Sequence, residues 1–262
     1  MGSKLGYTYD FRLKMLEKDE ISCRFADEKR DGVKTFIFQF TTNFILKIRR
    51  PEEEEEASSD LIIDSERFDT FFDQTGDEKR DLLGLVFNVY VRLQEYWMTR
   101  DEIYSIFNKT LDFTRNLASD RKYVRLNQIP VGVCIDVCTV QQEGEAYNDA
   151  LDRAIIADHL VPLDMCLILP PYVGTVRPMC CNRKLFLRKL RRVRVENVEE
   201  GLAIMPVCPI CSRSGKLGAQ ISTLPKCGHA FHYHCVFRWI EANGTMCPSC
   251  SRPVYDRVTE LF

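Results

Sequence analysis

The sequence lacks several features that would assign it to a common class at once. None of its apolar runs reaches the roughly 20 residues that cross a bilayer, so we expect no membrane span. The first residues contain no apolar core followed by a small-residue cleavage site, so we expect no secretory signal peptide. We find no glycine-rich phosphate loop and no internal repeat. These absences predict an intracellular protein, in the cytoplasm, the nucleus or both.

An excess of either charge is also missing. The 262 residues include 36 Lys and Arg against 38 Asp and Glu, which gives a formal net charge of −2. Because no positive field over the whole molecule would attract phosphates, we expect no nucleic-acid partner. A hydrophobic fraction of 45% with 28% charged residues is ordinary for globular chains, and it argues against extensive disorder.

The first 180 residues mix two hydrophobic periodicities. The expected elements are strands at 35–40 and 131–140, and helices at 82–97, 99–111 and 147–158. Thr99 and Glu102 have the spacing of a capping box, which marks the start of the second helix. The fold class predicted for the whole chain is α+β: a mixed α/β N-terminal domain over residues 1–180, of unknown function, followed by a small metal-binding module.

Two runs of charge interrupt this pattern. Pro51 followed by five glutamates predicts a solvated acidic loop. Residues 183–194 carry seven basic side chains with apolar ones between them, which is compatible with a basic amphipathic helix that lies on a membrane or binds a partner. Binding of nucleic acid through this run is a further alternative. A connector over residues 181–204, whose basic charge is balanced by nearby glutamates, is the interpretation that we favour.

Cysteine and histidine are concentrated in one short segment. Six of the twelve cysteines and three of the four histidines lie between residues 208 and 250. Cysteines are too sparse for a disulfide-built secreted scaffold, and thiols clustered in a reducing compartment are better interpreted as metal ligands. The candidate ligands in order are Cys208, Cys211, Cys227, His229, His232, Cys235, Cys247 and Cys250.

The spacing of these eight side chains fits two zinc sites. Pairs separated by two residues can reach one Zn²⁺ from a tight turn, and eight ligands complete two tetrahedral sites with no position left for water. The zinc ions are therefore expected to be structural. About fifty residues cannot bury enough apolar surface to fold alone, so metal is expected to decide the stability of the module. Spacing alone permits either two consecutive sites or two interleaved ones.

The string C-x2-C, x15, C-x-H-x2-H-x2-C, x11, C-x2-C resembles the RING finger in its RING-H2 form, over residues 205–255. The resemblance implies an interleaved cross-brace. One zinc ion would be held by Cys208, Cys211, His232 and Cys235, and the other by Cys227, His229, Cys247 and Cys250. His234 would break the ligand spacing and is not expected to bind zinc. Residues 256–262 are left as a C-terminal tail.

RING fingers of this kind bind ubiquitin-conjugating enzymes as parts of ubiquitin ligases, so the resemblance implies a ligase without a catalytic side chain of its own. Its surface for the conjugating enzyme would include Ile210, Trp239 and Pro248. Trp239 has core packing as its alternative role. Many active RING fingers carry a basic residue directly after the eighth ligand. Here Ser251 occupies that place and Arg252 follows, so a non-catalytic interaction module is the alternative function.

The remaining expectations concern partners and the other thiols. The implied partners are a conjugating enzyme, ubiquitin and an unknown protein substrate bound through the N-terminal domain. A long N-terminal region ahead of a C-terminal RING-H2 finger is similar to the layout of many plant ligases. The remaining cysteines and His159 have no ligand-like spacing, and we expect ordinary structural roles for them. Those cysteines are Cys23, Cys134, Cys138, Cys166, Cys180 and Cys181.

Overall fold

The computed structural model describes residues 6–17, 34–48, 60–73, 77–123, 125–166, 181–242 and 244–255. The acidic run that follows Pro51 and the tail 256–262 lie outside these residues. By its contacts the chain divides into two units, residues 1–150 with 155–157 and residues 151–154 with 158–262. The domain boundaries inferred from the sequence stay a prediction, because a division by contacts does not test which segments fold alone.

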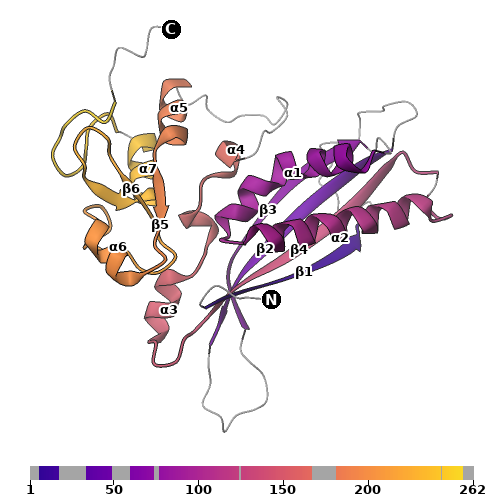
Figure 1. Cartoon of the computed structure of the whole chain (residues 1–262), viewed down its shortest axis with the longest axis horizontal. Helices are drawn as coiled ribbons and strands as arrows, with labels where there is room; N and C mark the ends of the chain where they lie inside the picture. The colour runs from indigo at the N-terminus through magenta and orange to yellow at the C-terminus, as the bar shows by residue number, and fades with distance from the viewer. Residues whose placement is uncertain are drawn as a thin grey trace. The chain divides into compact units, whose positions relative to one another are not determined.

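The first unit contains a four-stranded sheet in the order β1-β4-β2-β3 (Figure 1). Its strands are β1 (Tyr7–Met15), β2 (Thr35–Lys47), β3 (Asp60–Asp73) and β4 (Gln128–Val140). β2 and β4 run parallel at the centre, and the two edge strands are antiparallel to their neighbours. Both strands expected from the alternation of apolar residues are present, and they form this central pair. Each strand is longer than the range expected from the sequence. Both faces of these strands carry buried residues, so the simple alternation of apolar and polar residues does not mark their full length.

Two helices, α1 (Glu78–Glu95) and α2 (Arg100–Ser119), follow the third strand and pack against the sheet (Figure 1). The capping box at the start of α2 is confirmed. The Glu102 amide donates to Thr99 Oγ1 at 3.3 Å, and the Thr99 amide donates to Glu102 Oε2 at 2.7 Å. The sheet face beneath the helices carries an aromatic ladder in which Phe40 stacks on Phe68 with ring centroids 5.0 Å apart. This core explains the apolar stripes expected from the sequence.

A buried polar cluster ties the end of α1 to β3. Arg92 and Glu66 form an ion pair with side chains only 1% and 6% exposed. The Tyr96 hydroxyl donates to Glu66 and lies 3.1 Å from the Thr42 hydroxyl. Burial, together with the charge of Glu66, raises the pKa of Tyr96 far above its ordinary value, so this phenol stays protonated as a hydrogen-bond donor.

The second unit is built around a three-stranded antiparallel sheet in the order β5-β6-β7. Its elements are β5 (Arg192–Arg194), β6 (Gln220–Thr223), β7 (Ala230–His232), α5 (Cys181–Lys189), α6 (Val198–Ile204), α7 (Tyr233–Ala242) and the short helix α4 (Leu163–Cys166). Along the chain, β4 is followed by α3 (Tyr147–Arg153) and then by a 3₁₀ turn, Ala157–His159. The helix expected over 147–158 therefore ends earlier, at Arg153.

The basic run 183–194 does not form the single amphipathic helix that its sequence allows. The helix ends at Lys189, and Arg192–Arg194 form the edge strand β5. The apolar side chains of Leu187 and Leu190 are buried in one core with Phe231, Val236 and their neighbours, so this helix face is not available to a membrane. No helix among the described residues is long and apolar enough to cross a bilayer.

Candidate metal centres

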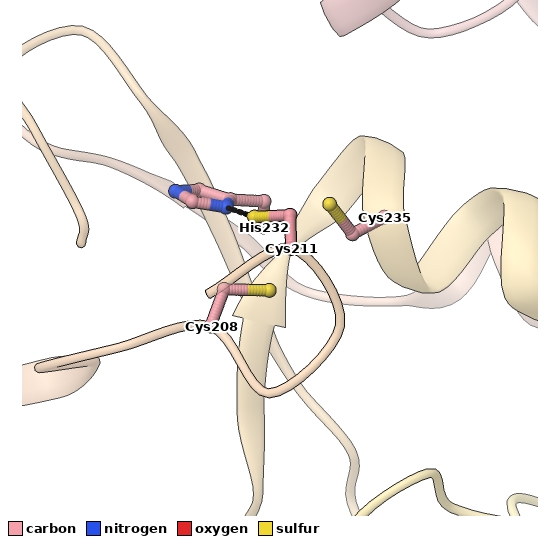
Figure 2. A group of neighbouring side chains, drawn as sticks. All are labelled: Cys208, Cys211, His232 and Cys235. Carbon is pink, nitrogen blue, oxygen red and sulfur yellow. Dashed lines mark hydrogen bonds between the residues drawn. The ribbon is translucent and has the colours of Figure 1, made fainter. Parts of the chain in front are cut away.

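The first group of candidate ligands is Cys208, Cys211, His232 and Cys235 (Figure 2). Three elements bring these side chains together. The first two cysteines lie on the turn after α6, His232 ends β7, and Cys235 lies in the first turn of α7. Their ligand atoms all lie within 4.8 Å of one another. The grouping is interleaved, because Cys227 and His229, which lie between Cys211 and His232 along the chain, belong to the other group.

His232 is oriented for ligation through Nδ1. This nitrogen lies 3.3 Å from Cys211 Sγ, while Nε2 lies 3.1 Å from the carbonyl oxygen of Ser214. An Nε2–H that donates to this carbonyl leaves the Nδ1 lone pair for a metal ion, and such carbonyl or carboxylate partners are usual for metal-bound histidines. Nothing in the sequence singles out Ser214, because its backbone oxygen makes this contact.

The second group is Cys227, His229, Cys247 and Cys250, whose ligand atoms also lie within 4.8 Å of one another. His229 Nδ1 lies 3.8 Å from Cys247 Sγ. Tetrahedral zinc, with Zn–S near 2.3 Å and Zn–N near 2.0–2.1 Å, separates a sulfur from a nitrogen by about 3.6 Å. The two sulfur–nitrogen distances, 3.3 and 3.8 Å, lie on either side of this value.

The two Cys-x2-Cys turns have the same backbone geometry. In each, the amide four residues after the first cysteine donates to that cysteine's carbonyl: Ser212 to Cys208 at 2.8 Å and Ser251 to Cys247 at 2.9 Å. The amide of the first cysteine donates in turn to the residue five positions later. Ser212 and Ser251 both take the left-handed conformation, with φ of 59° and 56°. Ser251 thus ends the second Cys-x2-Cys turn. It also occupies the position directly after the eighth ligand, where the resemblance leads us to expect a basic residue.

Two thiols of the first group, Cys208 and Cys235, influence each other's pKa. A hydrogen bond from Cys235 lowers the pKa of Cys208, and the same interaction raises the pKa of Cys235. Zinc binds the thiolate form, so a lowered pKa at Cys208 favours ligation. Cysteine and imidazole donors in fours favour Zn²⁺ over cations that prefer oxygen ligands. Each group therefore fits one zinc ion, with no position left for a catalytic water.

His234 lies outside both groups of ligands. Its ring stacks on His159 with centroids 4.2 Å apart, and it stacks on His232 at 5.3 Å. Burial, followed by the neighbouring histidines, lowers the pKa of His234 to about 3, so this imidazole is neutral. His159 thus has a specific packing partner, which its sequence environment did not indicate.

The cysteines outside the zinc module divide into two sets. Cys134 and Cys138 lie on the same face of β4, where burial raises the pKa of Cys138. Within the described part of the chain, the only clusters of three or more metal-ligating side chains are the two groups above. The other four cysteines have side chains outside the description: Cys23, Cys166, Cys180 and Cys181.

The three apolar residues expected to contact a conjugating enzyme lie on elements held by the metal groups. Ile210 and Pro248 are half-buried on the two turns, and Ile210 packs against the core. Trp239 lies on α7 and is 38% exposed, whereas Val236, Phe237 and Ile240 of that helix are buried. Core packing is therefore the role of its neighbours on the helix, and Trp239 presents an aromatic surface to solvent.

Known proteins match this chain in the C-terminal segment. The Ring finger domain model matches residues 206–251. The mouse E3 ubiquitin-protein ligase RNF6 is 44% identical over 50 residues, which cover 19% of this chain and 7% of that protein. The probable E3 ubiquitin-protein ligase RHA1A of Arabidopsis thaliana is 41% identical over 44 residues, covering 16% of this chain and 28% of that protein. The chain thus spans less than a third of the length of either relative.

The crystal structure of the RING-H2 domain of Arabidopsis RMR1 is 29% identical, covers 27% of this chain and 86% of that chain, and aligns with a TM-score of 0.24. The assignment depends instead on the domain match, the order of the ligands and their interleaved grouping. Residues 206–251 are therefore a RING finger domain of the RING-H2 kind, with two groups of ligands that fit one zinc ion each.

Proposed function

We propose that this protein is a RING-type ubiquitin ligase, which binds a ubiquitin-charged conjugating enzyme and promotes ubiquitin transfer to a substrate lysine. Relatives of the matched segment are named E3 ubiquitin-protein ligases, which supports this assignment. The observation that carries it is the exposure of Trp239 on a helix that otherwise buries its large apolar residues. An aromatic side chain held this way is suited to anchor a partner.

The proposed mechanism needs no acid, base or nucleophile from this chain. Each group supplies four protein ligands, which would complete the coordination of one zinc ion. The zinc ions would therefore serve to fix the two Cys-x2-Cys turns, one before and one after α7 in the chain. Ile210, Trp239 and Pro248 would contact the conjugating enzyme and restrict its flexible ubiquitin to reactive orientations. The lysine amine then attacks the thioester carbonyl, and the thiol of the conjugating enzyme leaves. The rate gain comes from orientation and from a shift in population.

The first unit is proposed to select the protein substrate. Its sheet and helices form a core of their own, distinct from the core around the RING finger, which supports a separate role. The identity of the substrate requires a binding experiment with the full chain. The proposed place of action is the cytoplasm or the nucleus.

A non-catalytic interaction module is the second candidate, and Ser251 favours it. Serine closes the second zinc turn where many active RING fingers have a basic side chain. Arg252, the next residue, is exposed and could supply a charge from a shifted position. The two candidates differ in what happens to a charged conjugating enzyme: a ligase accelerates its discharge, and a simple interaction module does not.

Replacement of Trp239 by alanine distinguishes these functions. We expect Trp239→Ala and Ile210→Ala each to slow discharge of a charged conjugating enzyme onto free lysine by at least tenfold, because central apolar anchors contribute most of the binding energy of an interface. Bound zinc should stay at two ions per chain. The measurement is single-turnover discharge by the full protein across a panel of conjugating enzymes.

Leu202→Ala is the matched control, because Leu202 is 42% exposed on α6 and lies on neither zinc turn nor α7. Its discharge rate should stay within twofold of the wild type. Absence of zinc-dependent discharge by the wild type with every conjugating enzyme of the panel would refute the ligase assignment and favour the interaction module.

A further inference from the structure

The segment after α7 lies unusually close to the end of that helix. A Cβ atom added to Gly244 would lie 2.6 Å from Ile240 Cα and 2.8 Å from the carbonyl oxygen of Trp239. Real Cβ atoms do not approach backbone this closely, so only glycine fits here without a shift of the chain. The segment leading to the second zinc turn is thereby packed directly against the part of α7 that carries Trp239.

Met246 is held beside Trp239 by this close packing. The indole Nε1–H of Trp239 donates to the backbone oxygen of Met246 at 3.0 Å. The backbone of Met246 is fixed from its other side by a β-bridge to Pro253, and the amide of Val254 donates to Thr245 at 2.8 Å. With its backbone fixed in this way, Met246 is 44% exposed.

We propose that Met246 is a further contact residue for the conjugating enzyme and determines which of these enzymes the protein prefers. This inference rests on the proposed ligase function. It places Met246 in the same docking surface as Trp239, because one hydrogen bond links the two residues and both expose apolar atoms. Met246 also directly precedes Cys247, so the second zinc group fixes its position relative to Pro248.

The occupant expected against Met246 is an apolar or aromatic side chain on the loop of the conjugating enzyme that meets this surface, which we call its docking loop. A thioether is polarisable and flexible, and it makes favourable contacts with aromatic ring edges. The preferred enzymes should therefore present a large apolar side chain at the tip of this loop. Enzymes with a polar side chain there should gain little from Met246, so the residue changes selectivity more than it changes overall activity.

The experiment compares Met246→Ala, Met246→Leu and Leu202→Ala in the full zinc-loaded protein. Leu202 matches Met246 in exposure, 42% against 44%, but lies on α6. Affinity for each conjugating enzyme is measured by titration calorimetry, and discharge of its ubiquitin thioester in single turnover. We expect Met246→Ala to lose about fivefold to thirtyfold in affinity for enzymes with an apolar loop tip, as do moderate contact residues of interfaces.

Three further results should accompany this loss. Met246→Leu should retain most of the affinity, because an apolar side chain of similar volume remains. Leu202→Ala should bind as the wild type does. Zinc content and the thermal midpoint should be unchanged in Met246→Ala, which separates a contact role from a structural one.

The inference is overturned if Met246→Ala binds and discharges every enzyme within twofold of the wild type while Trp239→Ala is defective. It is also overturned if the loss is the same for apolar and polar loop tips, or if zinc content falls. If the wild type discharges no enzyme of the panel, the proposed function fails first and this inference fails with it. That result is distinct from the other two, because Trp239→Ala then has no activity to lose.

Discussion

Removal of zinc is expected to unfold the sheet and helix around the metal groups while the first unit stays folded. Structural zinc contributes on the order of 10–16 kcal/mol in small modules, which exceeds the stability of most single domains. The four ligands of each group come from segments that are far apart in the chain. Several of these segments are turns, which have no hydrophobic core of their own. Hydrogen exchange should show β6, β7 and α7 losing protection in chelator, whereas β2 and β4 keep theirs.

Two histidine variants make this expectation specific. His232→Ala removes a ligand, so elemental analysis should find about one zinc ion per chain or fewer, with α7 unprotected. His234→Ala is the control, because this imidazole lies two residues away and stacks against His232 without belonging to either group. It should keep two zinc ions. Equal zinc loss in both variants, or a protected α7 after chelation, would contradict the two-site assignment.

Loss of Arg92 is expected to destabilise the first unit by about 3–5 kcal/mol, because the change leaves the carboxylate of Glu66 buried without its cationic partner. Arg92→Met keeps most of the side-chain volume, so the lost charge dominates the effect. The measurement is hydrogen exchange at the amides of β2 and β4, whose opening should become about 10²-fold to 10⁴-fold more frequent.

Two comparisons test the cause. The double variant Arg92→Met with Glu66→Leu should recover most of the stability, because a buried ion pair can be replaced by apolar side chains at little cost. Arg115→Ala should change exchange little, because its partner Asp112 is 69% exposed and such surface pairs contribute about 0–1 kcal/mol. Arg92→Met with unchanged exchange would show that Arg92 and Glu66 do not stabilise the sheet.

The metal groups could be predicted from the sequence because their information is local. Each close pair of ligands is set by a two-residue gap, and the RING-H2 resemblance supplied the interleaving that spacing left open. The helices α1 and α2 were predictable for a similar reason, since the apolar residues within 82–97 and 99–111 recur at helical spacing. Both depend on residues that are neighbours along the chain, where local conformation determines which side chains meet.

Other parts of the fold depend on contacts between distant segments, which the sequence does not reveal. Nothing in the pattern of β1 indicates that it pairs with β4, more than a hundred residues later. Leu187 and Leu190 read as part of a charged connector, yet the core around the zinc module buries them. Met246 was missed because a single methionine has no pattern, and its position beside Trp239 comes from a backbone hydrogen bond.

The pairing of β5 with β6 has a practical consequence for anyone who expresses the zinc module alone. A fragment that starts at residue 205, where the sequence motif begins, would delete β5 and leave β6 (Gln220–Thr223) with an unpaired edge. A bare strand edge is a template for intermolecular pairing and aggregation. Recombinant fragments that begin before Cys181 should therefore stay monomeric at concentrations where shorter ones precipitate.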